Sequence, residues 1–287
     1  MASSFCTILS QLVRLIKQPP APGAHQPYPK LRNFILDVMA EGRRKNTINL
    51  LFEAELSPIR EHLALYTERQ GEQLSLTSYI ARSLACTVDE NKALHAYRHG
   101  KSRLVLFDEV DLAVMVEREI DGSSLPIAML VRSANRKNIS EIHHELQSAK
   151  TAPLGKHGPM SALEKQFFEL PSPLRRIVWF FIRRDPYLFK QLAGTVGITS
   201  MGMHSSGSAV LIPITPMTLT LSIGAISKKL VIADGQVVES EVIQMNLGAD
   251  HDIIDGAPLM RFADRFKQKL RAGCAIRVNA LSTLAEN

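Results

Sequence analysis

One histidine stands among three aspartates near the end of the chain, in residues 248–256, whose sequence is GADHDIIDG. Imidazole and carboxylate groups so close together could hold a metal ion, decorate a turn or tune a catalytic base. On an extended segment, Asp250 and Asp252 would point away from the face that carries His251, which disfavours a metal site. The spacing His-x-x-x-Asp-Gly instead lets Asp255 turn back and fix a partner, while Gly256 permits a tight backbone. A histidine that merely ends a strand is the simpler alternative.

The elements around His251 are expected to hold it firmly. Asp234-Gly235 predicts a hairpin turn between two β-rich segments, and the second segment runs directly into the aspartate cluster. Beyond the cluster, apolar residues recur at helical spacing over residues 259–270, so a helix should begin at residues 256–258, Gly-Ala-Pro. His251 is therefore predicted between the end of a strand and the start of a helix.

The rest of the chain mixes strands and helices, which predicts an α/β domain. Residues 151–193 do not continue this alternation of strands and helices. They contain proline turns, an apolar block and pairs of arginines, which indicates a helical insertion packed on its own domain. A basic amphipathic helix that lies on a membrane surface is the second, less favoured interpretation. Strands are expected at 47–56, 104–107, 112–118, 125–130, 196–199 and 218–226, and helices at 57–69, 75–87 and 139–150, the last capped by Asn138 or Ser140.

Composition narrows the class of protein. The 287 residues are 45% apolar, enough for a large core, and carry a net charge of +6, which favours polyanionic partners. The basic residues are spread out and match no nucleic-acid-binding motif, so we expect no nucleic-acid partner. Three distant cysteines suit free thiols in a reducing compartment, and the expected location is the cytoplasm. Residues 1–28 should form a terminal helix and a proline-rich spacer ahead of one domain over 29–287.

Two motifs resemble one enzyme family. The segment DHDIIDG is similar to the Asp-His-Arg-x-x-Asp-Gly signature of the acyltransferase subunits of 2-oxoacid dehydrogenase complexes, relatives of chloramphenicol acetyltransferase. Upstream, VGITSMG resembles the Phe-Thr-Ile-Ser-Ser/Asn-x-Gly strand of that family, with Thr199 at the hydroxyl position and 251 − 199 = 52 residues before His251. Further similar segments are KNTINLLFEAEL, PIAMLVRSANRKNISEIHHEL and IPITPMTLTLSIGAI, so the likeness covers about residues 30–150 and 194–272.

The resemblance implies a fold and a reaction. The fold is the chloramphenicol acetyltransferase-like α/β (α+β) two-layer sandwich, a mixed β-sheet flanked by helices. The reaction is acyl transfer between a thioester, of coenzyme A or of a lipoyl or carrier group, and an acceptor thiol, hydroxyl or amine. Coenzyme A or acyl-coenzyme A would be a substrate, and no metal is expected.

The resemblance also implies roles for residues. His251 would be the general base, Thr199 the oxyanion donor and Asp255 the residue that holds the loop. Supporting residues and neighbours of the oxyanion site would be Arg43 or Arg44 as the partner of Asp255, with Asp250, Gly256, Ser200 and Gly202. Active sites in the family lie between the subunits of a trimer, so a homotrimer is implied.

The sequence differs from the family pattern at several places, which bears on the implied fold and reaction. Asp252 replaces an arginine, Gly197 replaces a threonine, and the 151–193 insertion is longer than the usual connection. We expect no lipoyl or subunit-binding domain, so a lipoyl group would arrive on another protein. A catalytically idle relative that binds a lipoyl or membrane partner is the alternative, but it has no physical reason to keep both His251 and a hydroxyl at residue 199.

Overall fold

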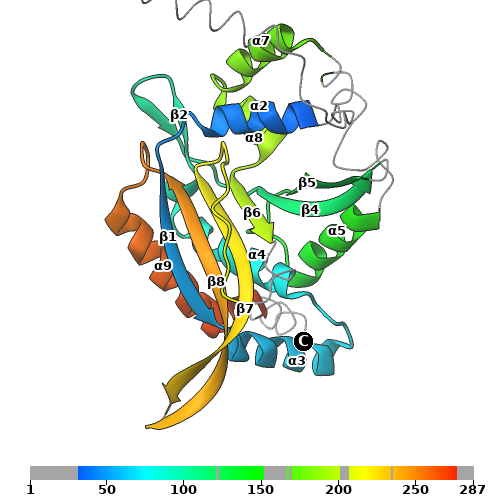
Figure 1. The fold of residues 1–287 in the computed structure, drawn as a ribbon, viewed down its shortest axis with the longest axis vertical. Helices are drawn as coiled ribbons and strands as arrows, with labels where there is room; N and C mark the ends of the chain where they lie inside the picture. The colour runs from blue at the N-terminus through cyan, green and yellow to red at the C-terminus, as the bar shows by residue number, and fades with distance from the viewer. Residues whose placement is uncertain are drawn as a thin grey trace, which may run out of the picture.

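The computed structural model describes residues 32–120, 123–151, 167, 170–200, 207–233 and 235–276 (Figure 1). The expected N-terminal helix and spacer over 1–28, and the candidate Gly202, lie outside these residues.

A six-stranded mixed sheet forms the centre of the molecule (Figure 1). Its strand order is β1-β8-β7-β6-β4-β5; β6 runs parallel to both β4 and β7, and the other pairs are antiparallel. The mixed sheet expected from the sequence is therefore confirmed. The strands are β1 (Thr47–Glu55), β4 (Leu112–Ile120), β5 (Ser123–Val131), β6 (Val196–Ser200), β7 (Leu219–Ala233) and β8 (Gln236–Asp250).

Helices bury one face of this sheet in the main core. The helix α4 lies at the centre, with Tyr79, Ile80 and Leu84 fully buried, and it packs against α3, α5 and α9. Phe266 of α9 is also fully buried and meets the ring of Phe52 from β1 edge to face. The helices are α3 (Ser57–Gln70), α4 (Leu76–Asp89), α5 (Ile139–Thr151) and α9 (Gly256–Arg271).

Local signals in the sequence set the ends of these helices. The Ser75 hydroxyl accepts a hydrogen bond from the Ser78 N–H at the start of α4. At the start of α5, the Asn138 side chain accepts from the Glu141 N–H at 2.8 Å, and the Glu141 carboxylate accepts from the Asn138 N–H. This reciprocal pair is a capping box, which confirms Asn138 rather than Ser140 as the cap.

A second, smaller cluster lies at one end of the sheet, where α2, α7 and α8 come together (Figure 1). The elements here are α2 (Arg32–Gly42), the 3₁₀ turn η1 (Lys92–His95), β2 (Tyr97–His99), β3 (Arg103–Val105), α7 (Ser172–Ile182) and α8 (Pro186–Ala193). Trp179, Ile182 and Phe189 pack on Tyr97 and Phe107. The described helices of the insertion are thus packed on the domain. Within the described residues, no helix is long and apolar enough to cross a membrane.

The helix α2 was not predicted, and it is held by the insertion. The buried Arg175 of α7 donates from Nε to a carboxylate oxygen of Asp37 at 2.6 Å, and it also donates to the Leu170 carbonyl. Arg183, just after α7, lies 3.4 Å from Glu41. These contacts fix α2 against residues that stand about 140 positions later in the chain.

The β7–β8 hairpin extends beyond the other strands of the sheet. Its closed end pairs Ala233 with Gln236, as the predicted turn requires, and Gly235 has a φ of 77° that favours glycine. In Figure 1 the distal half of the hairpin projects beyond the body of the domain. Leu230 and Ile232 on this projecting part are largely exposed.

Candidate active site

His251 is the first residue after β8, where the backbone turns towards α9. Its N–H donates to the Asn46 carbonyl at 2.8 Å, and the next turn closes when the Ile253 and Ile254 N–H groups donate to the Asp250 carbonyl. The side chain is 46% exposed, and its Nδ1 lies 3.7 Å from the Asp255 carboxylate. The backbone of His251 is therefore held while its ring stays open to a substrate. This position between a strand and a helix is the predicted one.

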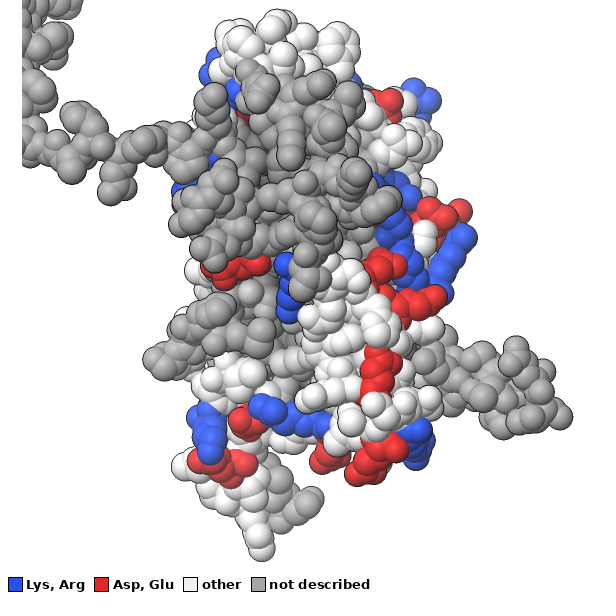
Figure 2. Space-filling model, turned by 90° about the vertical axis from the view of Figure 1, so that its right-hand side faces the viewer, with Lys and Arg blue, Asp and Glu red and all other residues white. Residues whose placement is uncertain are grey.

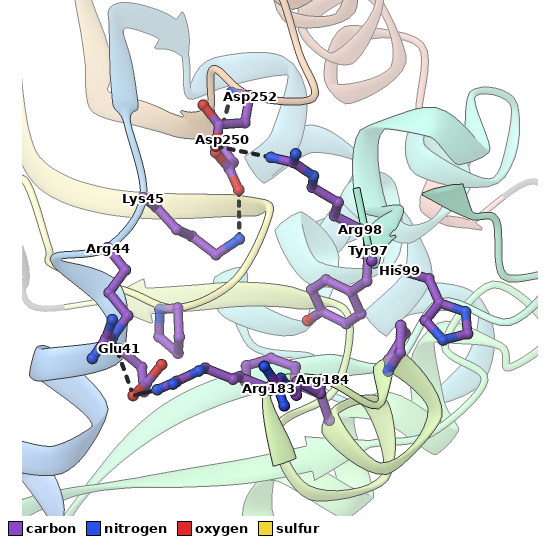
Figure 3. A pocket seen from close by; sticks show the side chains of 14 residues that line it. Glu41, Arg44, Lys45, Tyr97, Arg98, His99, Arg183, Arg184, Asp250 and Asp252 are labelled. Carbon is purple, nitrogen blue, oxygen red and sulfur yellow. Dashed lines mark hydrogen bonds and ion pairs between the residues drawn. The ribbon is translucent and has the colours of Figure 1, made fainter. Parts of the chain in front are cut away.

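Asp250 and Asp252 hold the loop from the other side. Asp250 is only 4% exposed, and its carboxylate meets the Lys45 ammonium at 2.5 Å and accepts from the Asp252 N–H (Figure 3). The Asp252 carboxylate accepts from the Asn46 amide at 2.9 Å and lies 3.8 Å from the Arg98 guanidinium. Both aspartates thus tie the loop to the start of β1 and to β2.

The basic segment before β1 reaches the loop through Lys45. Arg44 lies 3.4 Å from Glu41, and neither Arg43 nor Arg44 forms an ion pair with Asp255 among the described residues. Asp255 is 84% exposed. The predicted ion pair between Asp255 and Arg43 or Arg44 is therefore not present in this chain, and the next basic residue, Lys45, pairs with Asp250 instead. Three adjacent basic residues differ mainly in the direction that the folded backbone gives them.

Thr199 lies on β6 at a different level of the sheet. Its Cα pairs with that of Ser222 on β7, which in turn pairs with Asn246 on β8. His251 follows Asn246 by 251 − 246 = 5 residues. At about 3.3 Å per residue along a strand and about 4.8 Å between strands, the two Cα atoms are roughly 19 Å apart. The two predicted catalytic groups therefore do not meet within one chain.

Gly197, where the resembling family has threonine, lies in a crowded part of β6. A β-carbon at this position would come within 2.8 Å of both the Met217 sulfur and the Thr220 hydroxyl. Thr220 is itself hydrogen bonded to Thr215. The side chains of Met217 and Thr220 thus occupy the space that a side chain at residue 197 would need. Ser200, a predicted neighbour of the oxyanion site, is half-buried at the end of the same strand.

A cleft of about 660 Å³ opens beside the two aspartates (Figure 3). Five basic side chains line it against three acidic ones, and two of the five, Arg183 and Arg184, come from the insertion and stack on the Phe180 ring. The charged residues of its lining are Glu41, Arg44, Lys45, Arg98, Arg183, Arg184, Asp250 and Asp252. The excess of cations suits an anionic ligand.

The face of the molecule in Figure 2 carries charges of both signs. On the part of the surface coloured in Figure 2, Lys and Arg side chains lie among Asp and Glu side chains. Among the described residues, no group of three or more His, Cys, Asp or Glu side chains could hold a metal ion.

Comparison with solved structures identifies the fold. The chain superposes on a probable dihydrolipoamide acetyltransferase from Listeria monocytogenes with a TM-score of 0.64, at 16% identity, over 88% of this chain and 96% of the other. It superposes on the cubic core of the pyruvate dehydrogenase multienzyme complex with a TM-score of 0.61, at 14% identity, over 88% and 97% of the two chains. The predicted fold class is therefore confirmed as that of these acyltransferase cores.

Sequence comparison gives the same resemblance. Residues 190–274 match the family model of the 2-oxoacid dehydrogenases acyltransferase (catalytic domain). The chain is 24% identical over 216 residues to the dihydrolipoyllysine-residue acetyltransferase component of the pyruvate dehydrogenase complex from Rickettsia typhi, covering 75% of this chain and 45% of that protein. The Bacillus subtilis component is 22% identical over 231 residues, covering 78% and 44%. The predicted resemblance is confirmed, and the chain spans less than half the length of these relatives.

Proposed function

We propose that this chain is an acyltransferase catalytic domain that moves an acyl group between a thioester and an acceptor thiol, hydroxyl or amine. The thioester is that of coenzyme A or of a lipoyl or other carrier group. The observation that carries the proposal is the geometry of His251: a fixed backbone, a ring open to solvent, and a carboxylate 3.7 Å from Nδ1. A histidine placed this way is suited to act as a general base.

The spacing of the candidate residues supports the same conclusion. A solved structure with a TM-score of 0.62 comes from a study of a serine, a histidine and an asparagine in the catalytic mechanism of Azotobacter vinelandii dihydrolipoamide acetyltransferase. In that enzyme the serine precedes the histidine by 52 residues and the asparagine follows it by four. Here 251 − 199 = 52 and 255 − 251 = 4, so Thr199 and Asp255 stand at the same intervals from His251.

The mechanism assigns one task to each residue. The Asp255 carboxylate favours the proton on Nδ1 of His251, which leaves Nε2 free to accept the proton of the attacking thiol. The sulfur then adds to the thioester carbonyl, and the imidazolium returns its proton to the departing thiolate as the tetrahedral intermediate collapses. Such general-base catalysis is worth about 10² to 10⁴ in rate.

Thr199 acts on the intermediate itself. Its hydroxyl donates a hydrogen bond to the oxyanion, and removal of one such donor costs about 10² to 10³ in rate. Because Thr199 and His251 are roughly 19 Å apart in one chain by their register, the donor must come from a neighbouring chain. A ring of three chains, a homotrimer, supplies this contact three times.

The cleft supplies the cations for an anionic donor. Arg184 can meet a phosphate group of coenzyme A, since guanidinium groups bind phosphate in bidentate fashion. Arg44 and Arg183 share the single carboxylate of Glu41, which leaves positive charge beside it for a second phosphate. Asp252, which replaces the family arginine, faces Arg98 at the edge of this cleft. The negative charge of Asp252 is therefore partly neutralised by Arg98 of β2.

The experiment pairs binding with turnover. Coenzyme A and a panel of acyl-coenzyme A thioesters are titrated by calorimetry. Dihydrolipoamide is then added to the same samples, and the coenzyme A that forms on acyl transfer is followed by chromatography. His251→Ala should retain binding and lose at least about 10² in turnover. The control is His144→Ala, which changes a largely exposed histidine on α5. Wild-type turnover in a folded His251→Ala protein would refute the mechanism.

A further inference from the structure

Two cysteines outside the candidate active site lie against each other. Cys86 is in α4, and Cys274 lies 274 − 271 = 3 residues beyond the end of α9. Both are free and half-buried, and their thiols are within hydrogen-bonding reach of each other. Since α4 and α9 also pack side by side, the contact joins two core helices near their C-terminal ends.

A tight turn brings Cys274 back to α4. Gly273, the residue before it, has a φ of 71°, and the Ile276 N–H donates to the Gly273 carbonyl. A β-carbon on Gly273 would lie 2.8 Å from the His62 ring, so the turn is seated on α3. The position of Cys274 is therefore set by packing.

The surroundings favour a thiolate on Cys274. The hydrogen bond from the Cys86 thiol lowers the pKa of Cys274 and raises that of Cys86, while Lys269 and Arg82 act in the same direction on Cys274 as positive charges. Burial and the carboxylate of Glu90 oppose them. Lys269 is held in place by the Cys86 carbonyl at 3.2 Å and by Glu90.

We propose that Cys86 and Cys274 are an oxidative modification site, at which hydrogen peroxide converts the pair into an intrachain disulfide. The Cys274 sulfur attacks the peroxide, the O–O bond breaks, and the products are a sulfenic acid and water. The Cys86 sulfur then attacks the Cys274 sulfur, an S–S bond forms and a second water leaves. The two thiols lose two electrons and two protons, and the peroxide is reduced to two waters.

The disulfide would link α4 to the far end of the helix that starts after the His251 loop. It would close a covalent ring over residues 86–274, which contains β4 to β8 and α9. A cross-link over so long a segment restricts the unfolded chain strongly. Oxidation should therefore raise the melting temperature of the protein.

The test uses the full chain with Cys6→Ser, so that only the pair remains. The protein is treated with hydrogen peroxide, blocked with an alkylating reagent without reduction, and digested for mass spectrometry. We expect one peptide pair that joins Cys86 to Cys274, lighter by two hydrogen atoms than the sum of its parts, and its loss after dithiothreitol. Alkylation or sulfinic acid at both cysteines without a joined peptide would overturn the proposal.

Variants with one cysteine replaced distinguish the cysteine that attacks the peroxide, Cys274, from the one that attacks the sulfenic acid, Cys86. In Cys86→Ser, peroxide should leave a sulfenic acid on Cys274 that a dimedone probe captures, whereas Cys274→Ser should give little capture at Cys86. The pH at which iodoacetamide alkylation of Cys274 is half-maximal should also rise in Cys86→Ala, because alanine has no side-chain donor to replace the Cys86 thiol. The titratable groups that face the pair are Tyr79, Arg82, Glu90 and Lys269, and their retention in every variant makes the comparison direct. Equal capture in the two variants, or an unchanged alkylation profile, would contradict the assigned order of attack.

Discussion

Two inactive variants of this chain should restore each other's activity when they share a trimer. His251→Ala removes the proposed base and Thr199→Ala removes the proposed oxyanion donor. The β6–β7–β8 register separates the two residues by about five residues along the strands and by two strand spacings, or roughly 19 Å between Cα atoms. Both groups must approach one reacting centre to about 3 Å. On the proposed roles of His251 and Thr199, a single chain does not meet this condition, and each site combines residues from two chains.

The size of the recovery follows from chance assembly. In an equal mixture, a working site needs His251 from a Thr199→Ala chain and Thr199 from a His251→Ala chain as its neighbour. Each event has a probability of one half, so about one quarter of the sites should be complete in an unselected mixture of head-to-tail rings. Among trimers that contain both variants the share is about one third, because each such ring has one complete site of its three. Each variant alone should retain no more than about 10⁻² of wild-type turnover.

The assay compares mixed with separate trimers. The two variants are expressed together with different affinity tags, purified through both tags, and assayed for thiol release from acyl-coenzyme A. The control pairs His251→Ala with a chain that carries both substitutions, because no chain in that mixture supplies the base. Turnover of the mixed trimers no greater than that of the separate variants would refute a site shared between chains.

Three further substitutions test the framework of the site. Lys45→Met should lower the free energy of unfolding by about 3 kcal/mol in urea titration, because it leaves the buried Asp250 carboxylate without its ammonium partner. Adding Asp250→Asn to the same chain should recover part of this loss. A loss below about 0.5 kcal/mol in Lys45→Met would count against the role of the ion pair. Burial lowers the pKa of His95 to about 4 from 6.5. Stability should therefore be full above pH 6.5 and fall by about 3 kcal/mol as the pH drops to 4, and His95→Gln should flatten this dependence in pH-resolved denaturation. Gly197→Ala should cost about 1 to 3 kcal/mol in the same measurement, with partial relief by Met217→Ala; an unchanged midpoint would show that the strand yields freely.

The sheet and its main helices were predictable because their signals are local. Asp234-Gly235 set the hairpin register, and the Gly-Ala-Pro sequence with apolar residues at helical spacing set the start of α9. The helix α2 was missed because its apolar residues form two short runs, 34–36 and 38–40, on either side of Asp37, and such runs do not mark one helical face. Its structure depends on a partner far along the chain, Arg175, which no local pattern reveals.

The candidate site was also predictable only in part. His251 was singled out from its own motif, and the roles of Thr199 and Asp255 were predicted from the resemblance of two segments to family motifs, which keep their intervals along the chain. The lining of the cleft was missed, because Arg98 and Arg184 come from separate elements that only the tertiary fold brings together. Arg43 or Arg44 was expected to pair with Asp255, whereas the neighbouring Lys45 pairs with Asp250, because the folded backbone decides which way each side chain points.

The hydrogen bond from His251 to Asn46 has a consequence for the order of folding. It joins residues 205 positions apart, at the end of the β1–β8 pairing, which runs from Thr47 opposite Asp250 to Glu55 opposite Val242. Such distant contacts form slowly, because the closure of a long loop must precede any gain from pairing. During synthesis, β1 must wait for nearly two hundred further residues before its partner leaves the ribosome. The histidine loop is therefore among the last parts of the domain to take shape, and the appearance of activity should report completed folding.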